Sequence, residues 1–133
     1  MLDTKIIRNI LVISFRHKVS LQSENALEFK KIIKEYLRLN NYRVIINCEN
    51  LKFLDSSGIS TLISCLKEAF ANNGWIKIVN ISNSVKHIFE IIKLNQILPI
   101  FDSIDSALKP TNNLYLNWVI LPLVIHFSPQ IIN

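Results

Sequence analysis

The hydrophobic residues of this chain follow two spacings in turn, and this alternation predicts the order of its elements. Short apolar runs, which are typical of buried strands, cover residues 5–7, 10–15, 44–48, 75–79 and 100–101. Between these runs, apolar residues recur every three or four positions, which indicates amphipathic helices. The three longest helical stripes consist of Phe29, Ile32, Ile33 and Tyr36, then Ile59, Leu62, Ile63, Leu66 and Phe70, then Val85, Ile88, Phe89 and Ile92.

Residues that favour turns and helix caps stand at the ends of these elements. Arg8 and Asn9 are expected to form a two-residue turn between the first two strands, because Asn tolerates a positive φ. Ser23 is expected to cap the first helix and Asp102 the last. Two connections are expected to be loops, namely residues 16–22 and the stretch that runs through Leu51 and Phe53.

The resulting order is ββαβαβαβα, which predicts an α/β fold. Strand–helix–strand repeats require parallel pairing with right-handed crossovers, whereas the first two strands form an antiparallel hairpin. We therefore expect a mixed central sheet that is covered by amphipathic helices. Residues 1–109 complete this order, and 133 residues are enough for one domain with a substantial core.

Residues 110–133 differ from the rest because they contain no Asp, Glu, Lys or Arg. Their apolar run at 114–127 is shorter than the about 20 residues that a membrane-spanning helix needs, and Pro122 interrupts it. Three alternatives follow for this C-terminal tail. It packs on the domain or self-associates, it contacts a membrane surface, or it is disordered or absent from the working protein.

Charge and cysteine usage narrow the class of protein. The net charge of +5 is a mild basic bias and does not indicate nucleic-acid binding. Cys48 lies on a predicted buried strand and Cys65 on a helix, which favours reduced thiols and a cytoplasmic protein. Residues 1–13 lack the continuous apolar region and the cleavage site of a signal peptide.

No pattern of catalytic or metal-binding residues stands out. His17, His87 and His126 share no metal-ligand spacing with the cysteines, so no metal is expected. The chain has only two glycines and lacks a phosphate-binding run such as G-x-x-x-x-G-K. We therefore expect neither an enzyme nor a bound cofactor. A solvated helix face, with contact to an acidic partner as the alternative, is expected for the cations Lys30, Lys31, Lys34 and Arg38.

The most informative stretch is the Asp-Ser-Ser-Gly run that begins at Asp55, at the start of the second helix. On a helical wheel, Ser56 falls toward the edge of the buried face, where it is expected to cap or pack. Ser57 falls nearly opposite, in line with Thr61 and Ser64, and is expected to face outward. Free backbone N–H groups and the positive end of the helix dipole make that position hospitable to an anion.

The run from Leu54 to Gly58, between a strand and a helix, resembles the signature of STAS domains and, more narrowly, of bacterial anti-sigma-factor antagonists. The resemblance extends over residues 4–109. It implies that Ser57 is phosphorylated by a partner that is both an anti-sigma factor and a serine kinase. A serine phosphatase is a further partner that the resemblance implies. The alternative is an ordinary, unmodified serine at a helix start.

The same resemblance implies a surface that binds the partner. Its expected residues are Asp55, Ser56, Ser57, Gly58, Thr61, Ser64, Lys18 and Ser20. The role of Asp55 is open between orienting Ser57, capping the helix and contacting the kinase. For Gly58 the alternatives are close approach of a partner backbone and tight local geometry.

The loop at residues 16–22 departs from the family pattern. Many relatives carry Gly, an acid, an apolar residue and Asp where this chain has His17, Lys18, Val19 and Ser20. Two acids are therefore missing, and a cation replaces one of them. Because this loop lies beside the phosphorylated serine in the family fold, the departure predicts weaker repulsion of a phosphate and an altered charge preference of the partner.

Two functions from different classes follow. In the first, the domain is a regulatory switch that sequesters a kinase-type anti-sigma factor while Ser57 is unphosphorylated. In the second, it is a STAS-like accessory subunit of a membrane transport complex of the ABC type. The apolar tail slightly favours the second function, whereas the motif favours the first.

Overall fold

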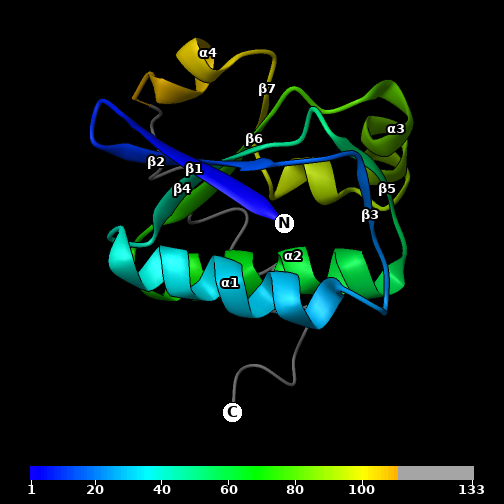
Figure 1. Ribbon diagram of the computed structural model, residues 1–133. Helices are drawn as coiled ribbons and strands as arrows, with labels where there is room; N and C mark the ends of the chain where they lie inside the picture. Colours follow the sequence, from blue (N-terminus) through cyan, green and yellow to red (C-terminus); the bar gives the residue numbers. More distant parts are fainter. Residues whose placement is uncertain (111–133) are drawn as a thin grey trace.

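The computed structural model describes residues 1–110, which form a mixed sheet with helices on both faces (Figure 1). The strands are β1 (Leu2–Ile7), β2 (Ile10–Phe15), β3 (Val19–Leu21), β4 (Arg43–Asn47), β5 (Leu51–Leu54), β6 (Trp75–Val79) and β7 (Ile100–Phe101). The helices are α1 (Ala26–Leu39), α2 (Ser56–Ala71), α3 (Asn83–Ile91) and α4 (Ile104–Leu108), with a short 3-10 turn, η1 (Leu94–Gln96).

The main sheet has the strand order β1-β2-β4-β6-β7. Its first pair is antiparallel, and the three other pairs are parallel. Arg8 and Asn9 join β1 to β2 with φ values of 51° and 67°, so both adopt the left-handed conformation that a tight two-residue hairpin requires. The predicted α/β fold with a mixed sheet is therefore confirmed.

A second, two-stranded parallel sheet consists of β3 and β5. Leu21 pairs with Leu54, and Val19 with Leu51. The expectation that residues 16–22 and the stretch through Leu51 and Phe53 are loops is therefore wrong. These strands are short and pair only with each other among the described residues, so neither shows a long alternating pattern. The small sheet places the end of β3 beside the start of α2.

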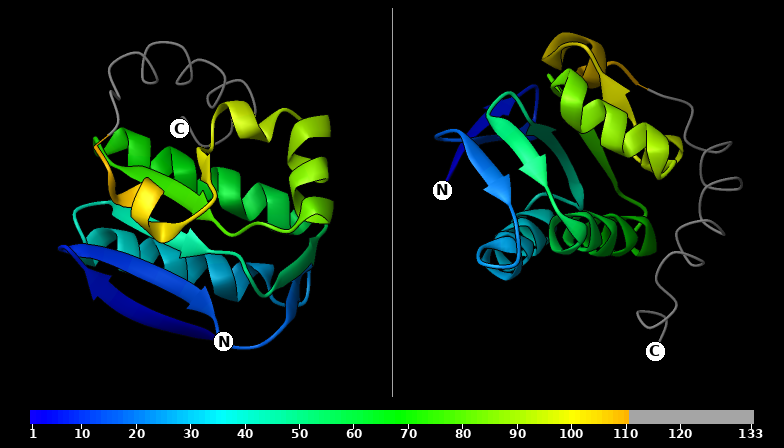
Figure 2. Two further views of the ribbon diagram at one scale, coloured as in Figure 1. Left: turned by 90° about the horizontal axis from the view of Figure 1, so that it is seen from above. Right: turned by 90° about the vertical axis from the view of Figure 1, so that its right-hand side faces the viewer.

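Helices α1 and α2 cover one face of the main sheet, and α4 covers part of the other (Figures 1 and 2). Successive residues of β4 face opposite sides, as the pleat of a strand requires. Val44 and Ile46 therefore belong to the large core under α1 and α2, whereas Ile45 packs in a smaller core near α4. All three side chains are fully buried. Helix α3 packs beside β5 and η1.

Lys77 of β6 is buried on the α4 side of the sheet. Its Nζ donates hydrogen bonds to the carbonyl oxygens of Ala107 at 2.7 Å and Lys109 at 3.3 Å. The ammonium also lies 4.4 Å from the ring centroid of Trp75 and 5.4 Å from that of Phe101. Burial lowers the pKa of Lys77. The cation therefore joins the end of α4 to the sheet, with both carbonyl and aromatic partners.

Two expected helix caps lie at different residues. Helix α1 begins after Asn25 and not after Ser23, and the Asn25 side chain accepts a hydrogen bond from the backbone of Gln22. Helix α4 is capped by Ser103, whose side chain accepts from the backbone N–H of Ser106. Asp102 therefore precedes the cap.

No helix within residues 1–110 has both the length and the apolarity that are needed to cross a membrane. The predictions for residues 111–133 concern a segment outside the described residues.

Candidate functional site

Asp55 fixes the start of α2. Its side chain accepts a hydrogen bond from the backbone N–H of Gly58 at 3.1 Å, so it is an N-cap that satisfies one of the free donors of the helix. Its own backbone N–H donates to the carbonyl oxygen of Leu21 at 3.0 Å. The helix start is therefore held both by its cap and by the end of β3. Of the roles left open for Asp55, capping is the one that its contacts perform.

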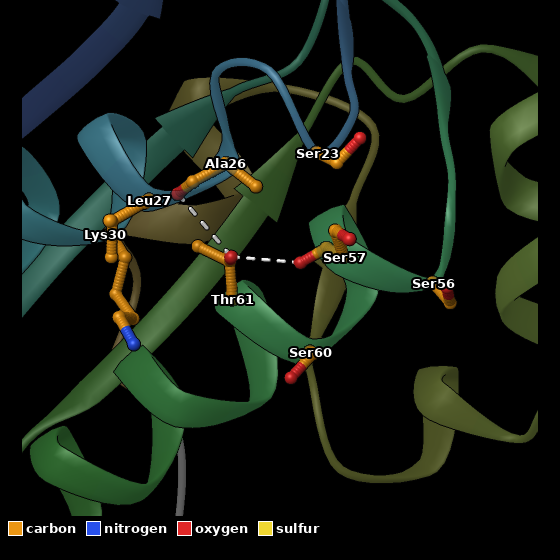
Figure 3. A pocket seen from close by; sticks show the side chains of 8 residues that line it. All are labelled: Ser23, Ala26, Leu27, Lys30, Ser56, Ser57, Ser60 and Thr61. Carbon is orange, nitrogen blue, oxygen red and sulfur yellow. Dashed lines mark hydrogen bonds between the residues drawn. The ribbon is translucent and has the colours of Figure 1, made fainter.

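The two serines after Asp55 differ in exposure, in the sense opposite to the wheel-based expectation. Ser56 is exposed, whereas Ser57 is half-buried. The Ser57 side chain faces the chain segment at Ser23 that leads into α1, and Ser56 lies on the other side of the first turn (Figure 3). Ser56 neither packs nor caps the helix, whose N-cap is Asp55, and Ser57 is the less exposed of the two, so the wheel-based expectation for this pair is wrong.

The reason is that α2 packs against α1 as well as against the sheet. Thr61 and Ser64 are 5% and 6% exposed, so the polar side of the wheel is a helix–helix contact. Thr61 Oγ1 lies 2.8 Å from the carbonyl oxygen of Ser57 and 3.4 Å from that of Ala26 in α1. The expectation that Thr61 and Ser64 face outward is therefore wrong, because both side chains are buried where α2 meets α1.

Gly58 is also buried, because α2 approaches β3 and β5 closely at this point. A Cβ on Gly58 would lie 2.6 Å from the carbonyl oxygen of Leu21 and 2.9 Å from the Cβ atoms of Leu21 and Leu54. Real Cβ atoms do not approach other atoms so closely. Tight local geometry therefore explains this glycine, and the expectation that Gly58 itself meets a partner does not fit its burial.

An open depression of about 360 Å³ lies between the starts of α1 and α2 (Figure 3). Its described lining residues are Ser23, Ala26, Leu27, Lys30, Ser56, Ser57, Ser60 and Thr61. Five of these eight carry a hydroxyl group, and Lys30 is the one charged residue among them. Such a surface can accept hydrogen bonds, donate them and attract an anion.

Sequence reasoning missed the contribution of α1 to this depression. The sequence predicts a helix cap at Ser23 and a solvated helix face at Lys30. Neither assignment brought these residues near Ser57, because the pairing of α1 with α2 depends on how both helices lie on the sheet. The one available signal was the small, polar side of α2 at Thr61 and Ser64, which permits close helix contact.

Lys18 and Ser20 lie on the segment that precedes and enters β3. Lys18 is exposed and Ser20 is half-buried. The Ser20 carbonyl oxygen accepts a hydrogen bond from the Asn25 side chain at 2.9 Å, which ties β3 to the start of α1. Because Leu21 bonds Asp55, this segment adjoins the start of α2. The structure thus brings Lys18 and Ser20 to the same end of the domain as Ser57.

The two cysteine thiols are remote from solvent. Cys48 and Cys65 are free and buried, and burial raises the pKa of each thiol to about 12. Within residues 1–110, no three His, Cys, Asp or Glu side chains gather closely enough to hold a metal ion.

The mixed five-stranded sheet and its helices define a small α/β domain whose distinctive surface is the hydroxyl-rich start of α2. The family model described as the STAS domain matches residues 1–107, and the chain therefore belongs to the STAS domain family.

Several of the similar proteins are named as anti-sigma factor antagonists. A protein of Thermotoga neapolitana, named as a candidate anti-sigma factor antagonist, is 24% identical over 110 residues, or 82% of this chain and 96% of the relative. The crystal structure of a candidate anti-sigma factor antagonist from Thermotoga maritima superposes with a TM-score of 0.70 at 22% identity, over 80% of this chain and 90% of the other.

The anti-sigma factor antagonist SpoIIAA has been solved in two forms that are similar to this chain. Its unphosphorylated form superposes with a TM-score of 0.59 at 19% identity, over 80% of this chain and 93% of the other. The phosphorylated form, from Bacillus, gives the same TM-score and identity over 80% and 96%. At these identities the likeness to solved structures establishes the fold alone.

Proposed function

We propose that this domain is an anti-sigma factor antagonist, which binds a kinase-type anti-sigma factor while Ser57 is unphosphorylated and releases it afterwards. The observation that carries the proposal is the position of Ser57. It occupies the second serine position of the STAS motif and faces the depression between α1 and α2 (Figure 3). The names of the Thermotoga relatives support the same function.

The switch follows from the charge that phosphorylation adds. Transfer forms a bond between the Ser57 hydroxyl oxygen and the γ-phosphorus of ATP, releases ADP and passes the hydroxyl proton to a base. The phosphate brings about −1.5 to −2 charges at pH 7. In the free domain, water and the positive end of α2 stabilise this charge. A docked partner would have to desolvate it without offering a counter-charge of its own, so the complex dissociates.

The proposed contact surface is smaller than the one expected from sequence. It contains the exposed and half-buried members, namely Asp55, Ser56, Ser57, Lys18 and Ser20, together with Leu27 and Lys30 from α1. Ser64 and Gly58 are buried, and Thr61, which is almost fully buried, only lines the depression. The cation Lys18, and the absence of acids at residues 16–22, favour a partner whose facing surface is acidic.

The experiment that tests this function uses the serine kinases of the anti-sigma factor type from the source organism. Each is incubated with the protein and ATP, and the phosphate is located by mass spectrometry. Ser57→Ala should abolish modification, and Ser56→Ala should retain it. Binding of the same kinase is measured before and after modification. Phosphate on Ser56 alone, or equal affinity of the modified and unmodified protein, would contradict the proposal.

This function places the protein in the cytoplasm with its kinase, and a serine phosphatase would restore the unmodified form. The second function, an accessory subunit of an ABC-type transport complex, stays a prediction. Affinity purification from the native cell distinguishes the two, because the first requires a serine kinase among the bound proteins and the second a transport ATPase.

A further inference from the structure

Lys30 is the one cation among the described residues that line the depression beside Ser57. It is half-buried, whereas its neighbour Lys31 is exposed and does not line the depression. The Lys30 side chain leaves α1 and crosses toward α2 (Figure 3). Of these two adjacent lysines, Lys30 therefore belongs to the surface of the depression and Lys31 does not.

The contact between the helices shows that Lys30 can serve the same space as Ser57. Thr61 Oγ1 bridges the carbonyl oxygens of Ser57 and Ala26, so the first turn of α2 lies beside the first turn of α1. Lys30 is one turn beyond Ala26. The Lys30 side chain runs from α1 toward α2, and its flexible four-carbon stem can carry the ammonium into the depression that Ser57 also lines.

We propose that Lys30 is the counter-charge of a phosphate on Ser57, and that their ion pair spans the depression and joins α1 to α2. This inference rests on the proposed function, because it concerns the modified serine. It assigns a role to a residue of α1 that the Asp-Ser-Ser-Gly motif does not contain. The Ser23 and Ser60 hydroxyls line the same depression and can donate further hydrogen bonds to the phosphate oxygens.

The charges around the proposed pair have opposite effects. Asp55 caps α2 close to Ser57 and repels a phosphate, as does Glu24 in the segment before α1. Lys18, before β3, attracts it. These groups stay unchanged when Lys30 alone is replaced. A difference between Lys30 variants therefore reports the contribution of that ammonium.

The test installs phosphoserine at position 57 by genetic encoding, so that no kinase is needed. The second ionisation of the phosphate, whose pKa is about 6 in an unperturbed phosphoserine, is followed by ³¹P NMR as a function of pH. An adjacent cation favours the dianion and lowers this pKa. Lys30→Met should therefore raise it by about half a unit or more, whereas Lys30→Arg should keep it low.

Two controls make the result specific. Lys31→Met removes the same charge one residue away and should change the phosphate pKa much less than Lys30→Met. Phosphoserine at position 56, on the other side of the turn, should be insensitive to Lys30→Met. Equal shifts from Lys30→Met and Lys31→Met, or no shift from either, would overturn the inference. Circular dichroism melts of the unphosphorylated variants verify that each one folds.

Failure of the proposed function and failure of the ion pair can be distinguished. If the phosphate pKa depends on Lys30 but no kinase modifies Ser57, the proposed function fails and the ion pair stands. If a kinase modifies Ser57 but the pKa of its phosphate does not depend on Lys30, the proposed function stands and the present inference fails.

Discussion

Gly58 lies so close to Leu21 that a Cβ on the glycine would be 2.6 Å from the leucine carbonyl oxygen. That same carbonyl accepts the backbone N–H of Asp55, the N-cap of α2. The position of the helix start relative to β3 is thus set by a hydrogen bond and by the absence of a side chain. This contact therefore determines how Ser56 and Ser57, in the first turn of α2, are oriented.

Replacement of Gly58 by Ala should destabilise the domain, because the added methyl group forces α2 away from β3. We expect a loss of about 1–3 kcal/mol in the free energy of unfolding, the usual range for overpacking. Urea denaturation followed by circular dichroism measures it. Ser60→Ala, on the exposed side of the same helix, is the control and should change stability little. A Gly58→Ala protein as stable as wild type would show that α2 can shift freely.

Leu27 offers a test of the partner surface that does not involve the serines. Its side chain is 57% exposed and lines the depression. A docked partner would bury this side chain, and burial of a Leu side chain contributes about 1 kcal/mol or more, so Leu27→Ala should weaken kinase binding about fivefold or more. Leu39, 71% exposed at the other end of α1, is the matched control. Calorimetry of both variants checks this, and equal effects would remove α1 from the interface.

The buried thiols of Cys48 and Cys65 should be inert in the native protein. At pH 8 we expect a disulfide reagent to label both quickly in urea and neither in buffer, because only the thiolate reacts. Their pKa values are raised by burial to about 12 from 9.0 in a model thiol. Rapid labelling of the folded protein would mean that the core around these residues opens readily.

The same pKa shift makes stability depend on alkaline pH. Between pH 9.0 and about 12 an unfolded chain loses these protons while the native state keeps them, so stability falls as pH rises. In that window each thiol lowers the free energy of unfolding by on the order of 1 kcal/mol per pH unit. Comparison of wild type with Cys48→Ala/Cys65→Ala at pH 8 and 10.5 isolates the effect. A fall of equal size in both proteins would exclude the thiols as its source.

A chain that ends at Lys109 should fold without residues 110–133. It keeps the Ala107 carbonyl group, to which the Lys77 ammonium donates, and a terminal carboxylate replaces the Lys109 carbonyl as the second acceptor, so α4 stays attached. We also expect it to self-associate less, because it lacks ten large apolar residues between positions 114 and 127. Thermal melts and sedimentation of both lengths measure these properties. An unfolded short chain would place the tail in the core.

The spacing of apolar residues predicted the main sheet because the pattern can be recognised locally and continues over most of the chain. The alternation of strands and helical stripes from residue 5 to residue 101 leaves little freedom once right-handed crossovers are required. Arg8 and Asn9 are a further success, since a two-residue turn admits few residue types. Apart from β1 and β7, for which the pattern covers only residues 5–7 and 100–101, the confirmed elements are those whose pattern covers five or more residues.

The remaining errors concern relations between elements. The three residues of β3 become a strand only by pairing with β5. No local sequence pattern predicts a pairing between segments that are so far apart in the chain. A helical wheel assigns one buried side to a helix, but α2 has two neighbours, so Thr61 and Ser64 became buried. Lys30 joined the site for the same reason. Tertiary contacts, and not propensity, decided each of these cases.

The strand order also bears on how quickly the chain can reach its fold. The β1–β2 hairpin closes through two residues, and such pairs form within about 1–10 μs. Every other pairing of the main sheet is parallel and must wait for an intervening helix, as when Leu11 meets Val44 across α1. Closure of such long loops costs entropy before the contacts form. We therefore expect the β1–β2 hairpin to form early and to offer an edge on which the next strand can pair. The parallel pairings from β2 to β7 should limit the folding rate.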